Sequence, residues 1–322
     1  MSDGRISRVR IGRTELEVPA ICFGMAPLGD MPETYGFVTD EDQARATIRA
    51  AFSSPFPFID TSRNYGMGKS EARVGAVIRE LEGKPADAVI STKLDRDADD
   101  RFTRDQARRS LEASLEALAV DRVDILHIHD PEHCADVDEV VREAIPELFA
   151  MKEEGLCDAV GLAAGKVDVM MPILREFDFD CIITHNRFTL VNRNANAMID
   201  FARERGMSVL NAAPYAGGAL AKGADATGRY VYQEASEAML EPIRAVEAIC
   251  ARHETATGAA ALALSLDDPR IASTLVGVSS PDHVEQTIEW AMTEIPDALH
   301  NELAAFPVSH DDPEATRNYT LG

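Results

Sequence analysis

Four ionisable side chains each lie at or just beyond the end of a short apolar segment in the first half of the chain: Asp60, Tyr65, Lys93 and His129. A tyrosine hydroxyl with an ordinary pKa of about 10 is a poor acid or base at neutral pH. A nearby ammonium group lowers that pKa because it stabilises the phenolate, and a carboxylate can keep the ammonium charged. A neighbouring imidazole can share a proton or orient a carbonyl or hydroxyl oxygen. Together these groups could interconvert an alcohol and a carbonyl.

The pair His127 and His129 also has an interpretation as metal ligands. Residues two apart on a strand point to the same side, and Asp130 or His133 could complete such a site. The lysine and the tyrosine fit no zinc site, so we predict that no metal is bound. With His129 at a site, His127 would lie one layer deeper as a core histidine that is satisfied by a hydrogen bond.

These residues need a scaffold that brings separate segments together. A short apolar segment, a polar turn and an amphipathic helix recur along the chain, and continuous apolar segments are typical of parallel strands buried on both faces. Eight strands are predicted, at residues 20–23, 57–59, 88–91, 123–128, 159–162, 181–183, 208–210 and 274–276. Helices are predicted between them, at residues 43–52, 69–81, 104–118, 137–154, 167–175, 194–205, 241–253 and 281–292, with a further apolar helix near 259–266.

Strands that alternate with helices in this way predict an α/β fold, a (β/α)8 TIM barrel. A doubly wound sheet is the alternative, but no G-x-G-x-x-G motif follows the first strand. Residues 8–18 alternate apolar and polar side chains around Gly12, which predicts an N-terminal β-hairpin. We therefore expect residues 1–322 to form a single barrel domain, with a polar, loosely held C-terminal tail at 308–322.

Reactive side chains of such barrels lie where the strands end, so the four ionisable residues would converge on one mouth. The loops at residues 27–37, 132–137 and 217–238 would then set substrate specificity. The third of these is longer than a normal barrel loop, and long loops in compact folds often act as lids.

The overall charge limits the partners of the protein. The chain has 55 acidic and 32 basic side chains and a formal net charge of −23, which disfavours nucleic acid and anionic membrane surfaces. It also favours a small neutral substrate over a phosphorylated one. Five cysteines without a CxxC pair fit a reducing compartment, and there is neither a leader pattern nor a long apolar run. We expect a soluble, cytoplasmic protein, and the sequence sets no oligomeric state.

Three motifs follow one another along the chain: FIDTSRNYGMGKSE at residues 58–71, STK at 91–93 and VDILHIHDP at 123–131. Together they resemble the motifs of the aldo-keto reductase superfamily. The similarity runs from Gly12 to about Trp290. It implies a (β/α)8 barrel that binds NAD(P)(H) without a Rossmann fold.

The resemblance also implies the roles of the four residues. Tyr65 would be the general acid/base, Lys93 and Asp60 would tune it, and His129 would orient the reacting group. One branch of the superfamily has segments that are similar to residues 23–29, 129–131 and 187–190 of this chain. That branch holds the aldose 1-dehydrogenases (L-fucose, L-galactose or D-threo-aldose type) and pyridoxal 4-dehydrogenase.

The chain departs from the family pattern around the nicotinamide. The family usually has Gly-x-Ser-Asn after strand five, whereas this chain reads GLAAG at residues 161–165. A glutamine is usual where this chain has His185, which could make a similar contact. The position of the usual stacking tyrosine aligns with Ala212, and Tyr215, three residues on, is the candidate replacement.

Cofactor choice is predicted from charge. The lysine and arginine that clamp the 2′-phosphate of NADP in the family align here with Gly277 and His283, and residues 271–292 contain no Lys or Arg. Ser279 precedes a helix N-terminus that could receive a phosphate on its backbone N–H groups. We therefore predict NAD rather than NADP, unless a distant arginine such as Arg270 supplies the missing cation. The predicted cofactor-binding residues are Met25, Asp60, His185, Pro214, Tyr215, Gly277, Ser279 and His283.

The resulting hypothesis is an NAD-dependent oxidoreductase that oxidises the anomeric hydroxyl group of a free aldose (L-fucose, L-galactose or D-arabinose type) to a lactone. Three alternatives remain open. They are a pyridoxal 4-dehydrogenase, an NADPH-dependent reductase of aldehydes and ketones, and a non-catalytic cofactor-sensing subunit.

Overall fold

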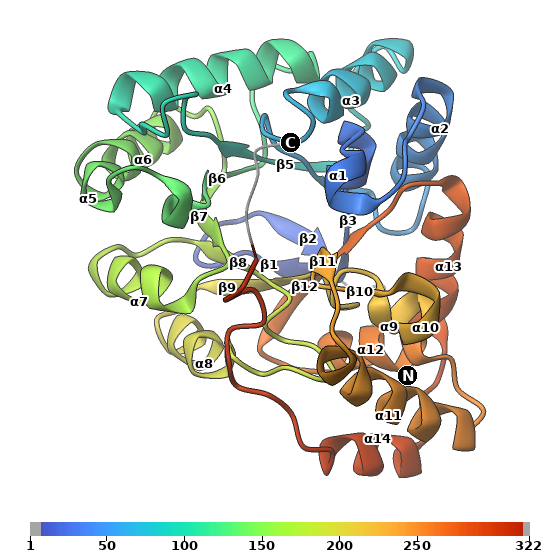
Figure 1. Ribbon diagram of the computed structural model, residues 1–322. Helices are drawn as coiled ribbons and strands as arrows, with labels where there is room; N and C mark the ends of the chain where they lie inside the picture. Colours follow the sequence, from blue (N-terminus) through green and yellow to red (C-terminus); the bar gives the residue numbers. More distant parts are fainter. Residues whose placement is uncertain (1–7, 318–322) are drawn as a thin grey trace.

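The computed structural model describes residues 8–317 and shows a closed barrel of parallel strands enclosed by helices (Figure 1). The strands pair in the order β12-β3-β4-β5-β6-β7-β8-β9. Their bounds are β3 Ile21–Gly24, β4 Phe58–Asp60, β5 Val89–Leu94, β6 Ile125–His129, β7 Ala159–Ala164, β8 Cys181–His185, β9 Ser208–Ala212 and β12 Ile271–Gly277. All eight overlap the predicted strands, which confirms the (β/α)8 barrel.

The predicted N-terminal hairpin is also confirmed. Strands β1 (Arg8–Arg10) and β2 (Glu17–Pro19) are antiparallel. Their connection packs under the barrel, where Ile11 and Val18 are fully buried among the inward-facing side chains of the strands. Gly12 allows this close approach, because it has a φ of +52° and an added Cβ atom would lie 2.5 Å from the Asp180 carbonyl oxygen.

The outer helices follow the predicted amphipathic segments. They are α2 Glu41–Phe52, α3 Lys69–Glu80, α4 Arg104–Leu118, α6 Ile145–Glu153, α7 Val167–Glu176, α8 Asn196–Glu204, α11 Glu237–Arg252, α12 Thr257–Leu266 and α13 Pro281–Met292. The helix predicted at 137–154 is interrupted, since a π-helical turn at Val140–Ala144 separates α5 (Val137–Glu139) from α6. Pro146 explains the break because it has no N–H for the regular helical bond. Helix α14 (Asp297–Ala304) was not predicted, and it buries only Leu299.

The long loop after β9 is structured. It contains α9 (Ala219–Lys222), α10 (Ala224–Thr227), β10 (Arg229–Tyr230) and β11 (Gln233–Glu234). Its buried side chains pack with those of α11 and α12 in a second hydrophobic cluster. At the mouth it meets the segment of α1 (Pro32–Tyr35): Arg229 donates to the carbonyl oxygens of Glu33 and Thr34, and the rings of Tyr35 and Tyr232 lie 5.7 Å apart.

The segment after α14 crosses the barrel beside β8 and β9 (Figure 1). We call residues 308–317 the C-terminal strap. Ser309 forms a parallel bridge with Asn192, and the backbone N–H of Arg193 donates to the Ser309 carbonyl at 2.8 Å. The side chains of Asn192 and Asn194 donate to the carbonyl oxygens of Asp311 and His310. The expectation of a loosely held tail is therefore wrong for these residues. Their polar composition does not show that they have hydrogen-bond partners elsewhere in the chain. Residues 318–322 of the predicted tail lie outside the described range.

Two further features concern the environment of the protein. Across residues 8–317, none of the helices combines the length and the apolarity needed to cross a bilayer. The five cysteines all lie within this range, and each is a free thiol.

Candidate active site

A cavity of about 620 Å³ opens at the carboxyl ends of the barrel strands. Its lining includes the four predicted catalytic residues, Asp60, Tyr65, Lys93 and His129, which come from β4, the loop after it, β5 and β6. The parallel register brings them together because it aligns the ends of neighbouring strands. The volume lies within the usual range for cofactor and substrate sites.

Lys93 and Asp60 form a buried ion pair on the cavity floor. The Lys93 ammonium donates to Asp60 Oδ1 at 2.5 Å and to the Thr61 carbonyl oxygen at 2.7 Å. Ser91 donates to the other carboxylate oxygen of Asp60 at 2.8 Å. Only 2–3% of either charged side chain is exposed. These bonds hold both charges in a fixed place without water.

Tyr65 lies half-buried above this pair. The Lys93 ammonium is 4.6 Å from the centre of the tyrosine ring. Among the described residues no group bonds to the Tyr65 hydroxyl, which leaves it available to a ligand in the cavity. Close contact between Gly66 and Gly29 fixes the loop, since a Cβ atom on Gly66 would lie 1.7 Å from the Gly29 carbonyl oxygen.

Burial raises the pKa of Tyr65 well above its ordinary value, and the charge of Asp60 raises it further. The sequence led us to expect the opposite direction, a pKa lowered by Lys93. The structure explains the difference because the Lys93 charge is largely balanced by Asp60. In the ligand-free protein Tyr65 is therefore a phenol at neutral pH.

His129 is held by a carboxylate that we did not predict, Asp95. The His129 Nδ1 atom lies 2.5 Å from Asp95 Oδ1, and Asp95 Oδ2 accepts bonds from the Ser62 hydroxyl at 2.7 Å and the Asn64 N–H at 3.0 Å. On the other side, Asp130 Oδ2 is 3.6 Å from His129 Nε2. Burial lowers the pKa of His129, but the charges of Asp130 and Asp95 and the bond to Asp95 outweigh it, so the pKa is raised.

The strand register could have identified Asp95. Lys93 pairs with His127 and Leu94 with Ile128 across β5 and β6, so Asp95, the first residue after β5, comes opposite His129. Parallel strands in register place such residues side by side.

His127 lies one layer deeper, as predicted for a core histidine. Its Nδ1 atom is 3.3 Å from the Ser91 hydroxyl and its Nε2 atom is 3.5 Å from the Cys181 sulfur. Burial, with a smaller contribution from Lys93, lowers the pKa of His127 to about 3, so the ring is neutral. The described residues include no cluster of three or more His, Cys, Asp and Glu side chains arranged for a metal ion.

The residues predicted to bind the cofactor mostly line the same cavity: Asp60, His185, Pro214, Tyr215, Gly277, Ser279 and His283. Met25 does not, because its side chain is fully buried in the core. Tyr215 packs edge-on against Trp290 with the ring centres 5.6 Å apart, and its hydroxyl is buried without a hydrogen-bond partner among the described residues.

The wall near α13 carries a histidine and a lysine. Nδ1 of His283 accepts from the backbone N–H of Ser279 at 3.4 Å, and burial, followed by the charge of Lys222, lowers the pKa of His283. Lys222 lines this cavity and lies 5.3 Å from the Phe37 ring, so a cation does stand near the predicted phosphate position. Arg270 is excluded from that role, because it precedes β12 at the opposite end of the barrel, where it pairs with Asp200 and Asp268.

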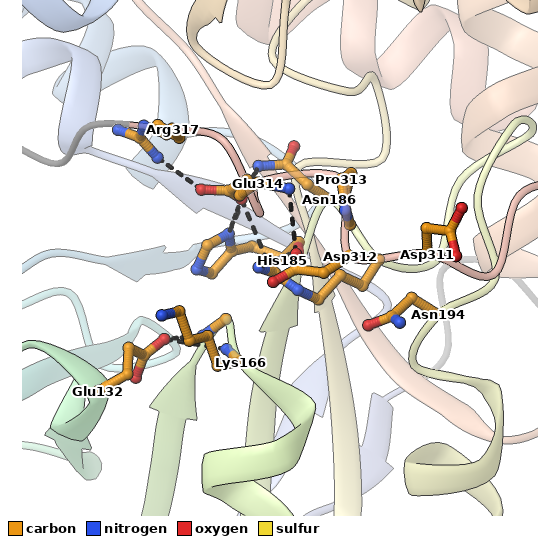
Figure 2. Close-up of polar contacts among 12 residues, drawn as sticks. Glu132, Lys166, His185, Asn186, Asn194, Asp311, Asp312, Pro313, Glu314 and Arg317 are labelled. Atoms are coloured by element: carbon orange, nitrogen blue, oxygen red, sulfur yellow. Dashed lines mark hydrogen bonds and ion pairs between the residues drawn. The ribbon is translucent and has the colours of Figure 1, made fainter.

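His185 has a partner in the C-terminal strap (Figure 2). Its Nδ1 atom lies 3.0 Å from Glu314 Oε1. Arg187, which is 1% exposed, bonds to Glu314 at 3.1 Å and to Asp312 at 2.6 Å. No local sequence signal links Glu314 to the site, since 128 residues separate it from Asn186, to which it also bonds.

Comparisons with known proteins identify the family of the chain. The model of the aldo/keto reductase family matches residues 20–306. The chain is 31% identical over 317 residues to D-threo-aldose 1-dehydrogenase from Pseudomonas sp, a match that covers 90% of this chain and 94% of that protein. It is 32% identical over 289 residues to L-galactose dehydrogenase from Arabidopsis thaliana, with 88% of each chain covered.

A solved structure shows the same fold. The holo form of an aldo-keto reductase from Bacillus halodurans superimposes with a TM-score of 0.77 at 20% identity, and the match covers 96% of this chain and 99% of that one. Family model and relatives extend over nearly the whole barrel. The chain therefore belongs to the aldo/keto reductase family.

Proposed function

We propose that the protein is an NAD-dependent dehydrogenase that oxidises the anomeric hydroxyl group of a free aldose to a lactone. The observation that carries the proposal is the convergence of Tyr65, Lys93 and His129 on one cavity, with the Tyr65 hydroxyl unpartnered. The two relatives described above are named for aldose and galactose dehydrogenation. Family membership supports a nicotinamide-dependent oxidoreductase, and the aldose and NAD are the parts proposed here.

In this mechanism Tyr65 moves the proton. A bound nicotinamide ring supplies the acceptor for the hydride that leaves C1 of the sugar. The Tyr65 phenolate takes the hydroxyl proton, and C1 becomes the carbonyl carbon of the lactone. Lys93, 4.6 Å from the tyrosine ring, is the cation beside the phenolate and offsets part of the charge of Asp60 there. Asp60 holds Lys93 charged and in place through its 2.5 Å bond.

His129 orients the reacting oxygen. The Nδ1–H group of His129 donates a hydrogen bond to Asp95, so Nε2, on the opposite side of the ring, is left for the substrate. Because Asp95 and Asp130 favour the charged ring, we infer that Nε2 carries a proton and donates it in a hydrogen bond to the sugar oxygen. Asp95 acts through His129 and is therefore a positioning residue.

The cofactor preference rests on the charge near α13. His283 is held neutral, and residues 271–292 contain neither Lys nor Arg. Lys222 is the cation near this wall, and it is exposed at the end of a four-residue helix. A 2′-phosphate would bring about two negative charges to that point. We infer that NAD is preferred and that Lys222 sets the residual activity with NADP.

The test is to mix the purified protein with NAD and one of four substrates, L-fucose, L-galactose, D-arabinose or pyridoxal, and to follow NADH absorbance. We expect oxidation of at least one of the aldoses. The Tyr65→Phe variant should bind NAD as the wild type does, and its rate of aldose oxidation should fall about 10²- to 10⁴-fold. Unchanged turnover in that variant would refute the role of Tyr65.

The alternatives give different results in the same assay. Turnover of pyridoxal alone would assign the pyridoxal dehydrogenase activity. Loss of NADPH with simple aldehydes, and no NADH formation with any aldose, would make the protein a reductase. Cofactor binding without turnover on the whole panel would make it a sensing subunit.

A further inference from the structure

Glu314 is a nearly buried carboxylate that four side chains from two segments of the chain surround (Figure 2). Its Oε1 atom lies 3.0 Å from His185 Nδ1 and accepts from Asn186 at 2.8 Å and Arg187 at 3.1 Å. Its Oε2 atom accepts from Arg317 at 2.7 Å. Only 10% of the Glu314 side chain is exposed.

This carboxylate remains charged at ordinary pH. Burial alone would raise the pKa of Glu314, but the charge and hydrogen bond of His185 and the charges of Arg187 and Arg317 outweigh it. The pKa is therefore well below its usual range. A charged acceptor that cannot move away makes a strong and directional bond.

The position of the strap does not depend on Glu314 alone. Ser309 and Asn192 pair through their backbones, and Asn192 and Asn194 bind two further carbonyl groups of the strap. Asp312 bonds to Arg187 at 2.6 Å. The strap thus presents Glu314 to His185 from a fixed position.

The cavity wall that β7, β8 and β9 form around His185 is largely apolar. Within the described part of the chain, these strands contribute Ala163, Ile183, His185 and Ala212 to the lining, and the polar side chains of Asp130, Tyr215 and Arg317 line the same cavity. Gly165 leaves room for the imidazole, since a Cβ atom there would lie 3.0 Å from His185 Nε2 and Cε1. Among the side chains that β7, β8 and β9 contribute to this wall, His185 is therefore the one that can bond to a polar group of a ligand.

We propose that Glu314 is a positioning residue that fixes the ring of His185, so that His185 Nε2 binds the carboxamide group of the nicotinamide. The proposal rests on the proposed function and adds a residue from the strap to it. Because the Nδ1–H group of His185 donates a hydrogen bond to Glu314, the Nε2 atom on the opposite side of the ring points away from the strap. A carboxamide has both a donor and an acceptor, so it can bond to Nε2 in either protonation state of the ring. Glu314 does not line the cavity, so it acts through the residues that it holds: His185, on which the proposal rests, and Arg317, which also lines the cavity.

The test compares a ligand that has a nicotinamide ring with one that lacks it. The dissociation constants of NADH and of ADP-ribose are measured by titration calorimetry, and by NADH fluorescence, for the wild type and for Glu314→Gln, Glu314→Ala and His185→Ala. We expect NADH binding to weaken about tenfold in Glu314→Ala and His185→Ala, the loss of one charge-assisted hydrogen bond. Glu314→Gln keeps an acceptor and should lose less. ADP-ribose binding should stay the same.

The double variant His185→Ala/Glu314→Ala should bind NADH no more weakly than His185→Ala, because Glu314 acts through the missing ring. Asp312→Asn is the matched control: it removes a strap carboxylate that also bonds to Arg187 but not to His185, and NADH binding should be unchanged. Equal losses for NADH and ADP-ribose, additive losses in the double variant, or no loss in Glu314→Ala would each overturn the proposal.

The two proposals fail separately in these experiments. A wild type that oxidises no aldose but shows the expected pattern of binding would refute the proposed reaction and support the role of Glu314. A wild type that oxidises an aldose, with NADH binding unchanged in Glu314→Ala, would support the reaction and refute that role.

Discussion

Replacing Asp95 with asparagine removes the negative charge that holds His129 and keeps the shape of the side chain. The His129 Nδ1 atom is 2.5 Å from the carboxylate, and 7% and 2% of the two side chains are exposed, so solvent screens the pair little. The side-chain oxygen of asparagine can still accept a hydrogen bond from the Nδ1–H group of His129. The loss is therefore the difference between a charged and a neutral hydrogen bond, about 1–2 kcal/mol. If His129 orients the reacting oxygen, the rate of aldose oxidation should fall roughly 5- to 30-fold.

Asp95→Asn should also lower the pKa of His129, because two of the contributions that raise it come from Asp95. The Cε1–H signal of His129, identified by its loss in His129→Gln, can be followed by NMR across pH. The imidazole of His129 should lose its charge at a lower pH than in the wild type. The part of the pH–rate profile that depends on this charge should also shift to lower pH. Asp97→Asn, at a half-buried carboxylate that bonds to the backbone of its own turn and not to His129, is the control and should change neither. An unchanged rate and an unchanged titration would refute the reasoning.

Three other predictions follow from the site and the fold. Aldose oxidation should become faster as pH rises from the acid side, because only the phenolate of Tyr65 can accept a proton and its pKa is raised, and the rise should stop where His129 loses its charge; initial rates with saturating NAD test this, and a rate that does not rise with pH would contradict it. Lys222→Ala should reduce kcat/KM with NADP more than with NAD, and equal reductions would remove Lys222 from cofactor choice. Gly12→Ala should lower the free energy of unfolding by about 1–3 kcal/mol, seen in urea titration, because of its positive φ and the 2.5 Å approach to Asp180.

The sequence was most informative where a signal is local. Continuous apolar segments identify the strands of a barrel because both faces of each strand are buried, and Asp60, Lys93 and His129 could be found because they follow or end such segments. Helix 104–118 was predicted to the residue, since Thr103 caps it through the Gln106 N–H.

Partnerships between distant residues were beyond such signals. Asp95 was missed because its role depends on the pairing of two strands, and Glu314 because it bonds to residues far away along the chain. The direction of the Tyr65 pKa was also missed. It depends on how completely Asp60 balances Lys93, and that is a matter of distances inside the folded cavity.

The hairpin under the barrel affects how protons exchange between the buried site and solvent. Ile11 and Val18 fill the amino end of the barrel with fully buried apolar side chains. The cavity that holds Tyr65 and Lys93 opens at the carboxyl ends of the strands. A sugar bound against Tyr65 would stand between Lys93 and that opening. Exchange of the Lys93 ammonium protons with deuterated water should therefore slow when the cavity is occupied.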